Sequence, residues 1–164
     1  TRVIPAGFPI PMMPAAAPVD RVFIMVVGGP SMTALQDFYG KSLGLSVGKA
    51  SAWRITVLSR ALNLPMETTY PLAVAAMAKD FLVELDEYPP KAIPRAVRAG
   101  SLPPGPAMVS FGVTELDDFK LNWRAPPARI AEFPYNGQEA AVAVGPAGEW
   151  VELVEIAGLA TTHQ

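Results

Sequence analysis

The chain has no cysteine and only one histidine among its 164 residues. Disulfides and thiolate chemistry are therefore excluded. The histidine, His163, stands next to the end of the sequence, so the chain offers no Ser-His-acid set for acyl transfer. Long apolar runs are also missing, because the strongly apolar stretch 21–27 is far shorter than a bilayer-spanning helix.

An excess of charge of one sign is absent too. Lys and Arg number 13 against 15 Asp and Glu, which leaves a net charge of -2. That balance argues against a protein that binds the phosphate backbone of nucleic acids. Residues 1–18 are apolar but are broken by prolines, so they do not match a secretory signal. We therefore expect a cytoplasmic protein with neither nucleic acid nor membrane among its partners.

Proline and apolar residues, in contrast, are abundant. Hydrophobic residues make up 51% of the chain, which is ample for the core of one domain. Of the 18 prolines, 11 gather in two places, five in an N-terminal arm and six in a central connector. They divide the chain into an arm (1–18), a first module (19–88), a connector (89–106), a second module (107–156) and a tail (157–164).

The first module reads as a strand, a helix and three more strands. Ser31 is a suitable N-cap for the helix, which carries apolar residues at spacings of three and four and is closed by Gly44. Residues 62–80 are expected to form a loop with a helical turn at 72–78. The predicted helix is 31–42, and the predicted strands are 21–27, 46–50, 53–59 and 81–87.

The second module repeats this order. Thr114 is expected to cap its helix, with Asp117 three residues further on. The predicted helix is 114–123, and the predicted strands are 108–113, 128–134, 139–144 and 149–156. The repeat is therefore one of pattern, with little identity between the two halves.

Three segments carry a family resemblance: DFYGKSLGL (37–45), VTELDDF (113–119) and GPAGEWVELVE (145–155). Together, and in this order, they resemble the vicinal-oxygen-chelate superfamily, the glyoxalase, bleomycin-resistance and extradiol-dioxygenase group. The resemblance covers residues 19–156. It implies an α+β fold in which two βαβββ modules form a curved, mixed, open sheet around a cup, with the helices outside. It also makes a homodimer a reasonable expectation.

Alternation along the strands predicts which side chains face the cup. If Glu152 faces the cup, Trp150 on the same strand does too, and the aliphatic residues between them and after them face the helices. The same division is expected in the other three strands. The predicted inward sets are Arg21, Phe23 and Met25; Leu82, Glu84 and Asp86; Met108, Ser110 and Gly112; and Trp150, Glu152 and Val154.

Metal enzymes of this superfamily supply one ligand from each of four strands. By position, the resemblance implies Arg21, Glu84, Met108 and Glu152 in these places. A guanidinium has no lone pair to donate, and a thioether suits hard or borderline divalent ions poorly. We therefore expect no metal and no other cofactor. Arg21 could instead stand between the two carboxylates in a Glu-Arg-Glu cluster, unless Glu84 and Glu152 never meet.

Glu152, Glu84 and Arg21 are the predicted catalytic residues. The predicted substrate-binding residues are Phe23, Met25, Trp53, Met108, Ser110 and Trp150, although any one of them could be ordinary core.

Four functions remain open. The first is a metal-independent protein that binds a small, partly apolar organic molecule in the cup. The second is a lactoylglutathione-lyase-like, isomerase or dioxygenase-type enzyme, with Glu84 or Glu152 as general base. The third uses both carboxylates to hold a divalent metal such as Mg or Mn. In the fourth, the chain is half of a larger protein with two cups.

Overall fold

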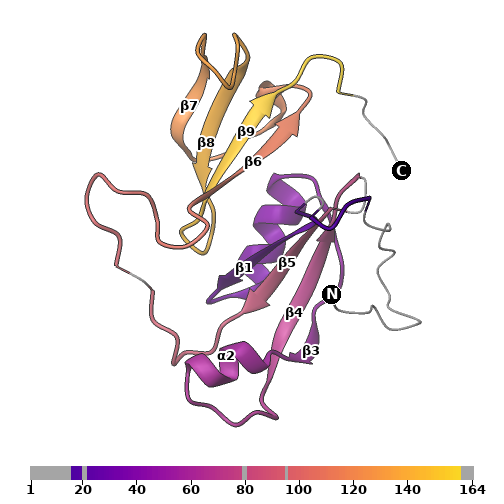
Figure 1. The fold of residues 1–164 in the computed structure, drawn as a ribbon, viewed down its shortest axis with the longest axis vertical. Coiled ribbons are helices and arrows are strands. Elements are labelled where there is room, and N and C mark those ends of the chain that lie inside the picture. The colour runs from indigo at the N-terminus through magenta and orange to yellow at the C-terminus, as the bar shows by residue number, and fades with distance from the viewer. Residues whose placement is uncertain (1–15, 20–21, 79–80, 95, 160–164) are drawn as a thin grey trace.

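The computed structural model describes residues 16–19, 22–78, 81–94 and 96–159 (Figure 1). Its strands form two separate sheets, one in each module. The first sheet has the order β1-β5-β4-β2, with β3 also paired to β4, and the second has the order β6-β9-β8-β7. The first sheet consists of β1 (Ile24–Gly29), β2 (Ser46–Val47), β3 (Ser51–Arg54), β4 (Thr69–Ala76) and β5 (Leu82–Glu87). The second consists of β6 (Met108–Val113), β7 (Trp123–Arg129), β8 (Glu139–Val144) and β9 (Trp150–Glu155).

Each sheet is built on one parallel pair of strands. In the first sheet β1 runs parallel to β5, with Val26 beside Glu84. In the second sheet β6 runs parallel to β9, with Ser110 beside Glu152. The remaining pairs are antiparallel in both sheets. The mixed, open α+β architecture predicted from the sequence is therefore confirmed.

The two modules also share one contact between a strand and a helical segment. Glu87, which ends β5, accepts a hydrogen bond of 2.6 Å from the backbone N–H of Met32, where α1 (Met32–Gln36) begins. Glu155, which ends β9, accepts one of 3.1 Å from Leu116, where the short 3-10 helix η3 (Leu116–Asp118) begins. In both modules a carboxylate at the end of the last strand thus satisfies a free N–H at the start of a helix.

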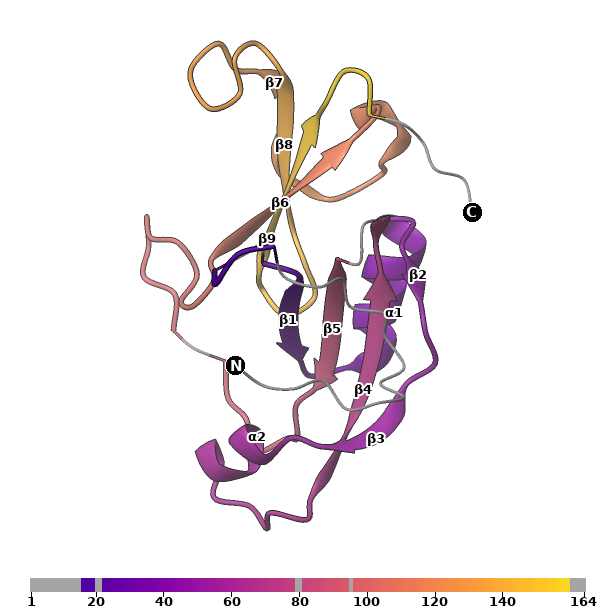
Figure 2. The ribbon, with the colours of Figure 1, turned by 45° about the vertical axis from the view of Figure 1, so that its right-hand side comes forward.

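The helix of the first module lies on one face of the first sheet (Figure 2). α1 continues directly into a π-helical segment, η1 (Asp37–Ser42), so the predicted helix 31–42 is confirmed. Ser31 caps it by accepting from the Ala34 N–H, and Gly44 follows it with a φ of 73°. Buried residues of this helix pack on the sheet residues of the same core: Val27, Met32, Leu35, Tyr39, Ala73, Ala75, Val83 and Leu85.

Two predictions for the first module were wrong. Residues 53–59 do not form one strand, because β3 ends at Arg54 and a helix, α2 (Thr56–Ala61), follows it. The strand next to β5 is β4, within the segment that was expected to be a loop with a helical turn. β4 is rich in alanine, which carries little strand preference, and this concealed it in the sequence.

The second module also departs from its predicted elements. Its helix is reduced to the three residues of η3, and Thr114 does not cap it, because Glu115 is the N-cap residue. The following strand, β7, begins at Trp123 rather than near residue 128. Pro126 and Pro127 lie inside this edge strand, where its register with β8 shifts. Prolines are tolerated at such irregularities of an edge strand.

The two modules contact each other through their helix-covered faces. Phe38 and Leu43, from the helix of the first module, and Phe111, from β6, pack against the cores of both modules. Tyr39, which is fully buried, donates a hydrogen bond of 2.8 Å to Glu149 in the turn before β9. The helix of the first module therefore joins the two sheets. No helix in the described segments has the length and apolar character needed to span a membrane.

Replacing Tyr39 by Phe tests this junction. The variant keeps the buried ring but leaves the Glu149 carboxylate with one donor fewer, and burial already raises the pKa of Glu149. We expect the free energy of unfolding to fall by about 1.5–3 kcal/mol, as for other hydrogen bonds to charged groups. Urea denaturation measures it. Glu149→Gln, which keeps an acceptor for the Tyr39 hydroxyl, should cost less, and equal losses in the two variants would contradict the assignment.

Candidate functional site

Each sheet has a second face, opposite the helix-covered core, which we call its open face. Residues that are paired directly across neighbouring strands lie on the same face. The open face of the first sheet therefore carries Val26, Glu84 and Val74. That of the second carries Ser110, Glu152 and Val142. The sequence predicted the inward position of Glu84, Glu152 and Ser110, and the strand pairing agrees with it.

The prediction for β1 was out of step by one residue. Met25 packs against the helix-side core, and Val27 is part of that core. Val26 is 51% exposed and shares the open face with Glu84. Because side chains alternate along a strand, a shift of one residue moves every side chain to the other face. Met25 is therefore removed from the predicted site. Arg21 lies outside the described residues, so the proposed Glu-Arg-Glu cluster stays a prediction.

Glu152 is the best-organised polar group on either open face. Its side chain is only 5% exposed, and both carboxylate oxygens accept hydrogen bonds from hydroxyl groups. Ser110, from the neighbouring strand, donates to Oε2, and Tyr135 donates to Oε1 at 2.6 Å. The hydrogen bond to Glu152, then burial and the charge of Glu152, raise the pKa of the Tyr135 hydroxyl. Glu152 is thus a fixed carboxylate whose hydrogen-bonding partners come from its own module.

An aromatic ring and a cation stand on the same face as Glu152. Trp150 lies two residues before Glu152 on β9, and the guanidinium carbon of Arg124 is 4.2 Å from the centroid of its ring. Arg124 is exposed, and no ion pair to it is found among the described residues. A guanidinium that stacks on an indole keeps its N–H groups free at the edges. This pair offers a flat apolar surface beside a positive charge.

Sequence reasoning missed two members of this site. Arg124 falls between the predicted helix 114–123 and the strand predicted near 128, but it lies on β7. Tyr135 lies in the loop between β7 and β8. It directly follows Pro134, which is joined to Phe133 by a cis peptide bond. Strand periodicity places residues only within strands, so it gave no signal for a tyrosine that reaches Glu152 from a loop.

The other predicted binding residues lie apart from Glu152. Phe23 precedes β1, and Trp53 is on β3, so both belong to the first module. The Trp53 ring is 51% exposed and donates to Ser51 at 2.7 Å. Met108, at the start of β6, pairs with Trp150 and is 39% exposed, so it borders the Glu152 face. Of the predicted set, Met108, Ser110 and Trp150 are brought together with Glu152.

The first open face carries two acidic residues, Glu84 and Asp86, whose pKa values are raised. Asp86 is only 3% exposed, and its Oδ1 has no hydrogen-bond partner in the described part of the chain. Burial, and then the charge of Glu84 two residues away, raises the pKa of Asp86 from 3.8 to about 7. Burial also raises the pKa of Glu84. The two open faces therefore differ, since Glu152 accepts a hydrogen bond at each oxygen, whereas Asp86 is buried with one oxygen that has no partner in the described part of the chain.

Few further donor atoms lie beside Glu84 and Glu152 in the described strands. Across each parallel pair, the partner of Glu84 is Val26 and the partner of Glu152 is Ser110. Both oxygens of Glu152 are already engaged by hydroxyls. Within the described segments, no three side chains of His, Asp or Glu gather as a metal site would require. Among the described residues, the donors on these faces are therefore carboxylates and hydroxyls, without an imidazole, and the expected absence of a metal stays a prediction.

Comparison with known proteins supports the fold. No family model matches the sequence, and no curated protein matches it either. Solved structures do match. The chain is similar to a glyoxalase family protein from Bacillus cereus, with a TM-score of 0.64 and 17% identity over 87% of this chain and 98% of that one. A glyoxalase/dioxygenase from Nostoc punctiforme gives a TM-score of 0.60 and 15% identity over 88% and 97%. A glyoxalase family protein from Enterococcus faecalis gives 0.57 and 15% over 82% and 97%. The chain therefore has the vicinal-oxygen-chelate fold that its motifs predicted.

The raised pKa of Asp86 predicts that the stability of the protein depends on pH. Because the folded chain holds the Asp86 proton more tightly than the unfolded chain, stability from this group is present below pH 4 and is lost as the pH rises toward 7. In Asp86→Asn that loss is removed. We expect the variant to gain about 2–4 kcal/mol relative to the parent between pH 4 and pH 8.

Denaturant titrations of both proteins across this pH range provide the measurement. Asp118→Asn changes an exposed acid in η3 and is the matched control, which should follow the parent. A parallel pH profile for Asp86→Asn and the parent would contradict the raised pKa of Asp86.

Proposed function

We propose that this protein binds a small, partly apolar organic anion on the open face of its second sheet, without a metal. The observation that carries the proposal is the arrangement around Glu152: a carboxylate held by two hydroxyls, next to an indole that carries a guanidinium without an ion pair among the described residues. The glyoxalase-like fold is the setting, since its members bind small molecules in the cup formed by their sheets.

The chemistry of these groups defines the ligand. Trp150 offers a flat surface on which a planar apolar group can stack, and Met108 borders it. Arg124 would pair with a carboxylate at one edge of the ligand. Glu152, being negative and held in place, would repel an anion placed over it and so orient the ligand with its charge toward Arg124. An aromatic carboxylate of one or two rings meets these requirements.

Titration with 2-naphthoate tests this proposal. We expect binding of one ligand per chain with quenching of tryptophan fluorescence, unchanged by EDTA. Arg124→Gln should weaken binding about tenfold or more, because an ion pair with the carboxylate is lost. Trp150→Phe should remove most of the quenching.

Controls separate this site from the rest of the protein. Arg129→Gln changes another exposed arginine of β7, which already pairs with Glu139 at 3.8 Å, and should bind as the parent does. The uncharged analogue 2-acetylnaphthalene should bind the parent and Arg124→Gln equally. Equal naphthoate affinity in the parent and in Arg124→Gln would refute the assignment, and a need for added divalent ions would refute the metal-free site.

We also propose that two copies of the chain associate through their unpaired sheet edges. β1 and β6 each stand at the end of their sheet's strand order. β1 also exposes Val26 beside its open edge. An edge strand of this kind can accept a strand from another chain, and most soluble homo-oligomers are two-fold dimers. Such pairing would extend the sheet next to the open face that carries Glu84.

Sedimentation equilibrium measures this association. The parent is expected to be dimeric at micromolar concentration, and Val26→Lys should raise the dissociation constant at least tenfold by placing a charge on the edge strand. Val57→Lys is the matched control, since Val57 is 72% exposed on α2 and should leave the dimer intact. A monomeric parent, or a dimer indifferent to Val26→Lys, would rule out this edge.

A further inference from the structure

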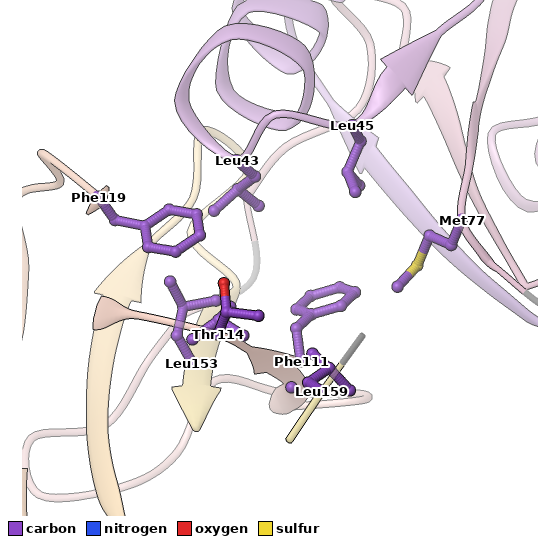
Figure 3. A pocket seen from close by; sticks show the side chains of 10 residues that line it. Leu43, Leu45, Met77, Phe111, Thr114, Phe119, Leu153 and Leu159 are labelled. Atoms are coloured by element: carbon purple, nitrogen blue, oxygen red, sulfur yellow. The ribbon is translucent and has the colours of Figure 1, made fainter. Parts of the chain in front are cut away.

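A pocket lies on the side of the second sheet opposite Glu152. It has a volume of about 330 Å³ and is lined by apolar side chains from both modules. Leu43 and Leu45 come from the end of the first module's helix and the residues after it, Phe111 and Leu153 from β6 and β9, and Phe119 from the segment after η3 (Figure 3). Because Leu153 follows Glu152 on β9, this pocket and the Glu152 face lie on opposite sides of the same strand.

The pocket exists because the second module lacks a full helix. In the first module, residues 30–45 between β1 and β2 include α1 and η1, which cover the sheet. In the second, residues 114–122 between β6 and β7 contain only η3. The apolar face of β6 and β9 is therefore covered in part by Phe38 and Leu43 of the other module. These two side chains do not cover the whole apolar face, and the pocket is the part that stays unfilled.

One polar group points into this apolar space. Thr114, which the sequence predicted to be a helix cap, instead has its hydroxyl directed between Leu43, Phe119 and Phe111 (Figure 3). No hydrogen bond to this hydroxyl is found among the described residues. The Leu116 N–H that a capping residue would serve is taken by Glu155. The Thr114 hydroxyl is therefore available to form a hydrogen bond with a molecule in the pocket.

We propose that this inter-module pocket is a second ligand site, which takes a small, uncharged, largely apolar molecule with one hydroxyl or carbonyl group. Its volume corresponds to on the order of ten non-hydrogen atoms, at ~30 Å³ for each water-sized group. Volumes of this order are found in small-molecule sites. The lining carries no charged side chain, so an anion is disfavoured. The ligand's polar group pairs with Thr114, and the rest packs on the leucine and phenylalanine side chains.

Isothermal titration calorimetry with 2-naphthol and naphthalene, on the full chain, tests this site. We expect one 2-naphthol per chain. Thr114→Val keeps the shape of the side chain but removes the hydroxyl, so it should weaken 2-naphthol binding about fivefold and leave naphthalene binding unchanged. Leu45→Trp fills the pocket from a half-buried position and should weaken binding of both at least tenfold. Circular dichroism confirms that each variant folds.

Further variants identify the site that the probe uses. Val57→Ala, on exposed α2, should not change 2-naphthol affinity. Trp150→Ala should not change it either, whereas a loss would place 2-naphthol on the Glu152 face and overturn the proposal. The naphthoate result stays separate, because it depends on Arg124 and not on Thr114. A failure of either site can therefore be told from a failure of the other.

Three other results would also overturn the proposal. One is the absence of saturable 2-naphthol binding to the parent. Another is tighter 2-naphthol binding in Phe8→Ser, which would mean that the N-terminal arm of the chain occupies the pocket. The third is an affinity that falls as protein concentration rises, which would mean that a second copy of the chain covers it.

Discussion

The register of the two parallel strand pairs is the constraint on which the rest of this structure depends. Pairing β1 with β5, and β6 with β9, sets which side chains share a face. One face of each sheet then receives the buried aliphatic residues, such as Val83 and Val151. The other receives Glu84 or Glu152. A slip of one residue in either pair would bury these carboxylates in a hydrophobic core, which costs several kcal/mol for each charge.

The same constraint explains how far the sequence could predict the site. Strands β5, β6 and β9 alternate clearly, so the faces of Glu84 and Ser110 followed from periodicity once the family resemblance had placed Glu152 inward. β1 is apolar on both faces, so alternation could not fix its phase, and Met25 was placed on the wrong side. β7 was predicted to begin near residue 128, whereas it begins at Trp123 and passes Pro126 and Pro127 through a shift of register. Contacts from loops, such as that of Tyr135, have no periodicity to reveal them.

The two open faces differ in how a buried carboxylate is hydrogen-bonded. Glu152 is buried, but two hydroxyls compensate for its lost hydration, and the group is fixed in place. Asp86 is buried without that compensation and lies near Glu84, so the folded chain favours its protonated form below about pH 7. A well-satisfied carboxylate adds little instability and specifies geometry, as a binding face requires. A poorly satisfied one lowers stability, because its lost hydration is not replaced.

The shortened helix of the second module connects these features. A sheet in this fold needs cover on one face, and η3 is too short to provide it. The helix of the first module therefore serves both sheets, through Phe38 and Leu43, and Tyr39 secures it to Glu149. A single helix that covers two sheets cannot fill both to the density of an ordinary core. The space left over lies directly behind the strands that carry Ser110 and Glu152, so the packing of Phe111 and Leu153 in that space bears on the geometry of the opposite face.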